Sequence, residues 1–535
     1  MLHGKCGVKA KERILAMKKK RHRCSLGSLT ALFLMIFTIL FPGLALSKTK
    51  PGEVIYACIL GTFFQKGGDP ATHVGGHAPL TATTVFEGLV DIGVDLRSLP
   101  SVASSWKIAP DWSYVDFIIK KGIKFHNGDP LTAEDVKYSF EKLMDPKLRM
   151  TLGVEYRKRI KDIEVISPYH ARFHLNMPAP DLWKRLWWDG AIMPKKYREA
   201  VGDQGFAEKP IGSGPFRWVE YKQDQYYKLE AVPNHHRKTP EFKYLTILYV
   251  PEHSTRLAML QAGEVDIAEI RGSQLPVVKN DPNLNFVQVK HIYGSSLTFM
   301  DMAFPDKPSP FHDIRVRKAV SMAIDRKTIC DKLLFGSASA WGEVLNPYNL
   351  GYDPTVQPDP YDPERAKKLL AEAGYSKGFE TALNCMTRDK EIMEALQSNL
   401  ADVGITAKIN VFEGGAWYDA HRGKKLTGLK IGGLWYDAEQ HPGADIQNAF
   451  NKDAIFTYVA DAEVEKAIDD SMAAKNDKEA AAWGKKLSKM IREKYFRPPL
   501  WSQHGNFGTS KKIVKWEQQL GSYPGTRFEY MKIKD

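Results

Sequence analysis

The sequence is short of cysteine and lacks the short motifs that mark the common catalytic sites. Only five cysteines occur among 535 residues. There is no Walker A loop, no His-Glu-x-x-His zinc helix, no Gly-x-Ser-x-Gly nucleophile elbow and no Cys-x-x-Cys pair. Carboxylates are plentiful, but no pair of them stands out from a solvated surface. We therefore expect no catalytic activity, since nothing specific supports the rival class, a secreted hydrolase.

Beyond residue 47 only Cys58, Cys330 and Cys385 remain. Three thiols allow one disulfide at most, and their spacing does not decide which pair would form it. Buried thiols are the default interpretation. Low-complexity tracts and short-period repeats are missing too, so this part of the chain is expected to be globular and large enough for two or three cores.

A long basic run is also missing from the chain beyond residue 47, although the formal net charge of the whole sequence is +13. Residues 1–47 hold nine lysines and arginines and one glutamate, so about +5 remains on the rest of the chain. The high isoelectric point is therefore partly a property of the N-terminal segment. No nucleic-acid partner is expected.

Residues 1–47 have the pattern of an export signal. Lys18–Arg23 is basic, Leu29–Phe41 is apolar but short for a membrane span, and Ala45-Leu46-Ser47 fits the small-x-small rule for cleavage after Ser47. Cys24 precedes the apolar run, so it is not a lipobox cysteine, and no lipoprotein is expected. An uncleaved anchor is the alternative, and Met17 is an alternative start.

A turn followed by a capped helix is predicted from Phe125 to Phe140. The segment His126–Pro130 is rich in residues that favour turns. Thr132 is predicted to cap a helix that runs to about Met144, with Asp135 completing an acidic form of the capping box.

Further along the chain, helices and strands alternate. One predicted helix has apolar residues at i, i+3, i+4, i+7 and i+8, which predicts one buried face. These residues are Val316, Ala319, Val320, Ala323 and Ile324. Other helices are predicted near 362–374, 392–403, 461–475 and 477–494, and strands at 53–60, 244–250 and 405–411. This alternation favours an α/β lobe.

Six stretches carry a resemblance that spans most of the chain beyond residue 47. They are FHNGDPLTAEDVKYSF, PIGSGPF, LQAGEVDIA, FHDIRVRKAVSMAIDR, YDPERAKKLLAEAGY and LQSNLADVGI. In wording and order they resemble solute-binding protein family 5, the oligopeptide-, dipeptide- and nickel-type periplasmic binding proteins of ABC importers. Each stretch by itself consists of turns, caps and apolar faces, so the stretches identify a fold and not a ligand.

The resemblance implies an α/β fold, the type II periplasmic-binding-protein clamshell, with an extra subdomain inserted in lobe one and a two-strand hinge. The expected division is a signal peptide at 1–47, lobe one at 48–91 and 208–290, the inserted subdomain at 92–207, lobe two at 291–502, and a C-terminal return to lobe one at 503–535.

The resemblance also implies a function. We expect a periplasmic, monomeric solute-binding protein that delivers a small organic solute or short peptide to an ABC permease in the inner membrane. A ligand held between the lobes would select the closed state by contacting both of them. A peptide receptor or chaperone is an alternative binding function.

Candidate ligand residues follow from the same resemblance. Trp417 and Trp435 are similar to family positions that line the cleft from lobe two, although a core tryptophan is an equal alternative for Trp417. Arg388 is near where some relatives hold a ligand carboxylate, with a solvated surface as its alternative. Tyr436 and Phe64 are also included in the predicted set.

One departure from the family bears on the ligand. Peptide-binding members place an aspartate three residues after the tryptophan that corresponds to Trp435, where it pairs with the peptide's amino terminus. This sequence has Ala438 there, so ordinary peptide binding requires Asp437 or Asp445 to substitute, because a buried ammonium without a carboxylate is costly.

No metal and no cofactor is expected. His73 and His77 have the spacing of metal ligands on a helix, but two glycines between them make a helix improbable, so two loop histidines are the favoured interpretation. Because the family's cleft receives this loop, the pair is kept as a distant metal candidate. His235 and His236 are interpreted as residues of a surface loop.

Overall fold

The computed structural model describes most of the compact unit Lys48–Asp535. The residues outside the description are 1–51, 59–67, 73–82, 94–96, 149–150, 180–181, 183–185, 187–189, 435–440, 451–455, 518–526 and 535. The export signal and seven predicted site residues lie outside the described residues, namely Phe64, His73, His77, Trp435, Tyr436, Asp437 and Ala438.

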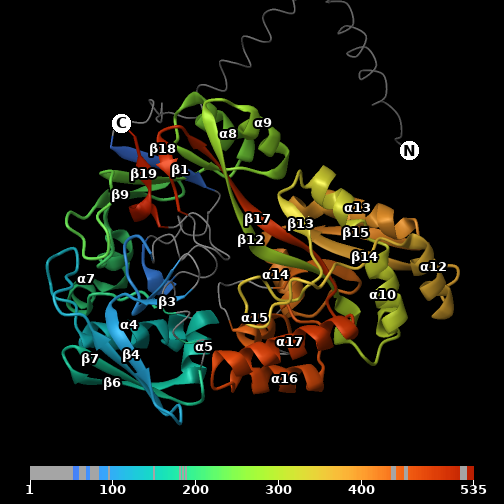
Figure 1. Cartoon of the computed structure of the whole chain (residues 1–535), viewed down its shortest axis with the longest axis horizontal. Helices are drawn as coiled ribbons and strands as arrows, with labels where there is room; N and C mark the ends of the chain where they lie inside the picture. The colour runs from blue at the N-terminus through green and yellow to red at the C-terminus, as the bar shows by residue number, and fades with distance from the viewer. Residues whose placement is uncertain are drawn as a thin grey trace, which may run out of the picture. The chain divides into compact units, whose positions relative to one another are not determined.

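One large sheet connects most of the described strands (Figure 1). Its spatial order is β15 (Ile405–Phe412), β14 (Phe379–Met386), β16 (Leu429–Gly433), β12 (Leu284–Phe299), β17 (Pro499–Ser510), β11 (Ile267–Glu269), β1 (Glu53–Cys58), β10 (Tyr244–Tyr249), β9 (Tyr226–Ala231) and β8 (Phe216–Lys222), with β13 (Ala338–Ala340) paired to β17.

Two long antiparallel strands, β12 and β17, link the two halves of this sheet and run side by side in Figure 1. The early part of β12 pairs with the late part of β17, which also pairs with β11. The late part of β12 pairs with β16 on its other edge. The pairing is interrupted between Val289 and Tyr293, where His291 has a left-handed φ of 58°. These strands form the two-strand connection that the resemblance implies.

A separate four-stranded sheet carries the inserted subdomain. Its order is β4 (Ala103–Ile108), β5 (Tyr114–Ile119), β7 (His170–Leu175) and β6 (Ile160–Ser167), and α4 (Ala133–Leu143) and α7 (Lys195–Glu208) belong to the same part of the chain. Its apolar residues belong to the same core as those of β1 and β10, so the insertion and lobe one share one continuous core.

The predicted turn and capped helix are confirmed. The backbone N–H of Thr132 donates to the Asp135 carboxylate at 2.9 Å, and α4 starts at the next residue. Gly128 adopts a φ of 91°, which only glycine adopts readily. The side chain of His126 lies 2.9 Å from the carbonyl oxygen of Gly214, so this turn is joined to the PIGSGPF stretch.

The other lobe contains the helices whose periodicity was visible in the sequence. Helix α10 (Ile314–Met322) buries the first three residues of the predicted face, and the last two, Ala323 and Ile324, are buried just beyond its end. The lobe also contains α11 (Arg326–Thr328), α12 (Pro363–Glu372), α13 (Lys390–Ala401), α14 (Gly414–Arg422), α15 (Pro442–Phe450), α16 (Ala462–Met472) and α17 (Asp477–Glu493). Among the described helices, none is long and apolar enough to cross a membrane.

Candidate ligand-binding site

A basic and aromatic cluster lies where α14, β16 and the segment at 456–458 meet. Trp417 and His421 stand four residues apart on α14, which places both side chains on one helix face. Lys430 comes from β16, and Phe456 and Tyr458 lie against it. We call these five side chains the Lys430 cluster.

Trp417, a predicted ligand residue, is only 8% exposed. Its ring lies edge-on to His421 with 4.2 Å between centroids, and tilted to Phe412 at 5.8 Å. It belongs to a small apolar core with Met300 and Leu426. These are the contacts of the alternative interpretation, a core tryptophan, and direct contact with a ligand stays a prediction.

His421 is fully buried next to a tyrosine. Its Nδ1 lies 2.6 Å from the Tyr458 hydroxyl oxygen. Burial, assisted by the charges of Lys430 and Lys424, lowers the pKa of His421 to about 3, so its ring is neutral at pH 7. Burial also raises the pKa of Tyr458, so the phenol keeps its proton. Nε2 of His421 has no hydrogen-bond partner among the described residues.

Lys430 is only 3% exposed, although lysine is rarely buried in proteins. Its Nζ lies 4.7 Å from the ring centroid of Phe456, 5.4 Å from that of Tyr458 and 5.8 Å from that of Trp417. Burial, with the nearby charges of Arg497 and Lys424, lowers the pKa of Lys430. The Lys430 amine is therefore surrounded by aromatic rings, and two further cations, Arg497 and Lys424, lie close to the cluster.

A glycine in β16 makes room for a second cation. Nη2 of Arg497 donates to the carbonyl oxygen of Gly433 at 2.6 Å. A Cβ at Gly432 would lie 2.5 Å from that nitrogen, so any larger residue would displace the guanidinium. Lys424 donates to the carbonyl oxygen of Thr457, which keeps a third cation nearby.

Asp445, one of the two predicted substitutes for the missing family aspartate, is buried on α15. Its Oδ2 accepts hydrogen bonds from the side-chain amides of Asn346 at 3.1 Å and Asn349 at 2.5 Å. Arg388, another predicted ligand residue, lies in η9 (Thr387–Asp389) with its side chain 67% exposed and 3.6 Å from Asp389. The structure thus places these two predicted residues in different surroundings, and their binding roles stay predictions.

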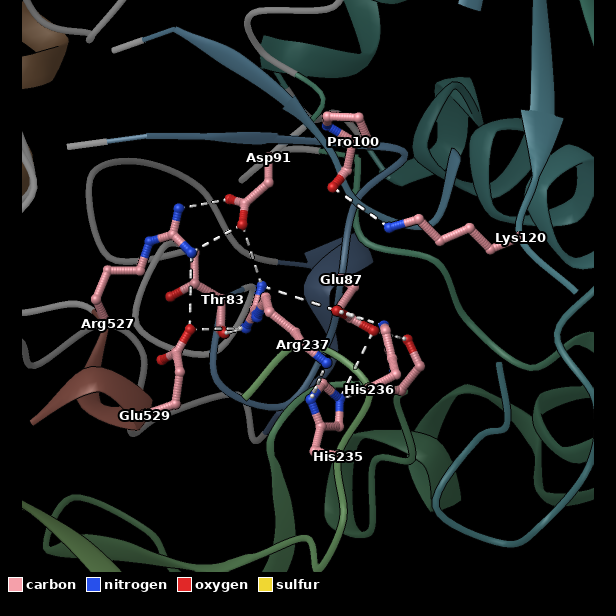
Figure 2. A network of polar contacts seen from close by, with 12 residues as sticks. Thr83, Glu87, Asp91, Pro100, Lys120, His235, His236, Arg237, Arg527 and Glu529 are labelled. Atoms are coloured by element: carbon pink, nitrogen blue, oxygen red, sulfur yellow. Dashed lines mark hydrogen bonds and ion pairs between the residues drawn. The ribbon is translucent and has the colours of Figure 1, made fainter. Parts of the chain in front are cut away.

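His235 and His236 lie in a loop, as predicted, and His236 is exposed, but the side chain of His235 is buried. The side chain of His235 is 4% exposed and that of His236 is 32% exposed, and both approach the fully buried Glu87 (Figure 2). His236 Nε2 is 3.2 Å from Glu87 Oε1, and Ser213 Oγ donates to Glu87 Oε2 at 3.0 Å. His235 follows a turn in a polar stretch, so its local sequence gave no sign of its burial.

Arg237 extends this contact into a network across three chain segments. Its guanidinium lies 3.8 Å from Glu87, 3.6 Å from Asp91 and 3.1 Å from Glu529 (Figure 2). Arg527 forms two hydrogen bonds of 2.8 and 2.7 Å with Asp91. Burial alone would raise the pKa of Glu87, but the His236 hydrogen bond and the Arg237 charge lower it to about 2.

The ligand atoms of Glu87, His235 and His236 lie within 4.8 Å of one another, which is close enough for a metal ion. However, Nε2 of His235 lies 2.7 Å from the carbonyl oxygen of Ser213, and its Nδ1 accepts the backbone N–H of Arg237 at 3.2 Å. Both ring nitrogens are thus engaged, and a guanidinium already neutralises the carboxylate. We therefore interpret this arrangement as an ion-pair network that stabilises lobe one.

Comparison with known sequences finds one matching family model and several similar binding proteins. A family model described as bacterial extracellular solute-binding proteins, family 5, matches residues 99–453. Heme-binding protein A of Haemophilus influenzae is 29% identical over 362 residues, which cover 62% of this chain and 65% of that relative. Di/tripeptide-binding protein 1 of Pseudomonas aeruginosa is 29% identical over 409 residues, which cover 68% and 73%. The alignment with the first relative thus spans just under two thirds of its length.

Solved structures resemble this chain over most of its length. The periplasmic binding protein DppA of Helicobacter pylori, in complex with the peptide STSA, has a TM-score of 0.76 at 22% identity and covers 90% of this chain and 98% of its own. HbpA2 of Haemophilus parasuis has a TM-score of 0.78 at 20% identity, with 90% and 100% covered. The chain therefore has the α/β fold of periplasmic binding proteins, as its sequence predicted.

Proposed function

The chain belongs to family 5 of the bacterial extracellular solute-binding proteins, and from this premise we propose that it delivers a small organic solute or short peptide to an ABC importer. The observation that carries the proposal is the family match over residues 99–453. Relatives named for dipeptides, in Escherichia coli at 27% identity, and for di- and tripeptides support a ligand of this size.

The proposed mechanism is closure of two lobes about the paired strands β12 and β17. A ligand that contacts both lobes binds the closed state better than the open one, and it shifts the population by that difference in affinity. The closed form would then be the form that the permease recognises. No chemical step is needed, so we propose a binding protein without catalysis.

The finer features of the sequence prediction are part of this proposal. They are an export signal cleaved after Ser47, release into the periplasm without a lipid anchor, a monomeric state, the lobe boundaries given above, and ligand contacts from Phe64, Trp417, Trp435, Tyr436, Asp437, Ala438, Asp445 and Arg388. The absence of catalytic motifs, together with relatives that are binding proteins, argues against a secreted hydrolase.

A thermal-shift screen tests the proposal. The purified chain is heated with di- and tripeptides, N-acetylated peptides, free amino acids, sugars, amines and haem, each at several concentrations. A ligand at a hundred times its Kd should stabilise the folded state by about 2.7 kcal/mol. Mass spectrometry of the recovered ligand is the control. Conversion of the ligand to a product, or no stabilisation by any solute, would contradict the proposed function.

A further inference from the structure

A buried lysine, which has no carboxylate partner among the described residues, lies at the centre of the Lys430 cluster. Lys430 is 3% exposed, and no carboxylate of the described residues forms an ion pair with it. The charged groups that influence its ammonium, Arg497 and Lys424, are both positive. Removing an ammonium from water without a counter-charge is strongly unfavourable.

Aromatic rings compensate only part of this cost. The ammonium lies 4.7 Å from the Phe456 ring centroid and 5.4 Å from that of Tyr458, distances at which ring faces attract a cation. A ring attracts a cation much more weakly than a carboxylate at hydrogen-bond distance does. The surroundings of Lys430 therefore favour the approach of an anion.

A second hydrogen-bonding group faces the same two rings. The His421 ring centroid is 4.8 Å from that of Phe456 and 5.6 Å from that of Tyr458. Its Nδ1 is engaged with the Tyr458 hydroxyl at 2.6 Å, while its Nε2 is fully buried and without a partner in the described part of the chain. When Tyr458 donates to Nδ1, the neutral ring carries its proton on Nε2 and presents an N–H donor.

We propose that Lys430 receives a carboxylate group of the transported solute, with Nε2 of His421 as a second donor. The ammonium supplies the counter-charge and the imidazole supplies a directed hydrogen bond. The apolar rings around them exclude water, which strengthens both interactions. This inference rests on the proposed function and assigns a ligand class to it: solutes that carry a carboxylate.

The test compares a carboxylate with its amide on the unmutated chain. The probes are Ala-Ala-Ala, its C-terminal amide, N-acetyl-Ala-Ala-Ala and a set of small dicarboxylates, with affinity measured by calorimetry. We expect at least one carboxylate to bind about tenfold or more tightly than its matched amide. Because no variant is involved, this comparison tests the ligand class even if substitutions at Lys430 impair folding.

Variants then assign the effect to Lys430. Lys430→Met should remove the preference for acid over amide, and His421→Phe should reduce it. Lys430→Arg should retain most of it. Lys408→Met, which removes an exposed lysine from β15, is the control that should change nothing. If Lys430→Met keeps the acid preference, the inference is wrong.

The two proposals fail in different ways. If neutral solutes bind and carboxylates do not, the assignment of Lys430 is wrong and the transport function stands. If no solute of the whole screen binds, both are wrong. If the acid preference is lost equally in Lys430→Met and Lys408→Met, it arises from general charge, and the assignment of Lys430 is overturned.

Discussion

The carboxylate of Glu87 is fully buried and lies within 4 Å of His235, His236 and Arg237. Replacing it by glutamine keeps the shape of the side chain and removes its charge. The positive charge of the Arg237 guanidinium is then balanced by less negative charge nearby. We expect Glu87→Gln to lower the free energy of unfolding by about 3 kcal/mol in urea, a typical cost of breaking a buried ion pair. Glu164→Gln, at an exposed acid, is the control and should change it by less than about 0.5 kcal/mol. Equal effects of the two would contradict the role of the network.

The pH dependence of stability should reveal the titration of Glu87 and of two buried histidines near it. Burial lowers the pKa of His126 and His235 to about 4, below the unfolded value of about 6.5. The unfolded chain therefore binds protons first, and stability should fall as the pH drops from about 6.5 to 4. Glu87, with a pKa of about 2, contributes stability above about 4.3 that is lost as the pH falls from there toward 2.

Urea unfolding at a series of pH values from 8 to 3 measures this profile. Glu87→Gln should flatten only its lower part, below about pH 4.3, because the histidines remain in place. A free energy of unfolding that stays constant between pH 7 and 5 would show that the two histidines do not titrate as their burial implies.

A single residue also bears on the ligand's amino group. Ala438 stands where the family resemblance implies an aspartate that pairs with a peptide's amino terminus. Ala438→Asp should therefore raise affinity for free-amino tripeptides about tenfold, the effect of a charge-assisted hydrogen bond, and leave N-acetylated tripeptides unchanged. Calorimetry with both peptides measures this. An equal change for both would mean that the pocket differs from that of peptide-binding members at more positions than 438.

At the scale of elements, two glycines of the PIGSGPF stretch permit a close crossing of two segments. A Cβ at Gly212 would lie 2.0 Å from the carbonyl oxygen of Val85, and one at Gly214 would lie 2.5 Å from that of Thr84. We expect Gly212→Ala to cost about 3 kcal/mol or more of unfolding free energy, because backbone atoms cannot move aside as a side chain can.

Gly205→Ala is the matched control for this crossing. Gly205 lies in α7, and the nearest atom to a Cβ there is in the side chain of Val201, at 3.0 Å. Alanine favours a helix over glycine by up to about 1 kcal/mol, so this variant should be neutral or slightly more stable. If both variants were equally stable in urea, the crossing would tolerate a methyl group and the argument from close approach would be wrong.

Local patterns explain why so many elements were predictable. The buried face of α10 and the cap of α4 depend on residues within a few positions of each other, and both agree with the structure. Ser254 is of a residue type that often caps a helix, but α8 (His253–Ala262) begins before it and has Glu252 as its N-cap. Serine and glutamate both occur in first turns, so the sequence alone does not distinguish the two starts.

Long-range pairing explains what sequence reasoning missed. Glu87 meets His235 and Arg237 across about 150 positions, and Arg527 meets Asp91 across 436. No local signal marks such partners. Lys430 was missed for a related reason: an alternating apolar and charged strand predicts an outward-facing lysine, but β16 lies inside the sheet between β14 and β12, next to α14.

At the scale of the whole molecule, closure depends on the paired strands β12 and β17. A hinge absorbs a large change in backbone angles at a few residues. The interruption of pairing between Val289 and Tyr293, with His291 at a φ of 58°, is a place where regular pairing is already relaxed. His291 Nδ1 lies 2.9 Å from Ser502 Oγ, and the backbone N–H of His291 donates to His504 Nδ1 at 3.2 Å, so the two strands stay joined there.

If this joint works as a hinge, a ligand that contacts both lobes should make the molecule more compact. Small-angle X-ray scattering at saturating concentrations of a solute from the thermal-shift screen should show a smaller radius of gyration than the ligand-free chain. A solute that gives no thermal shift is the control and should leave the profile unchanged. Superimposable profiles with a tightly bound ligand would mean that binding does not select a closed state, because the ligand would then have no differential affinity with which to shift the population. Recognition of the loaded protein by a permease would then need a signal other than closure.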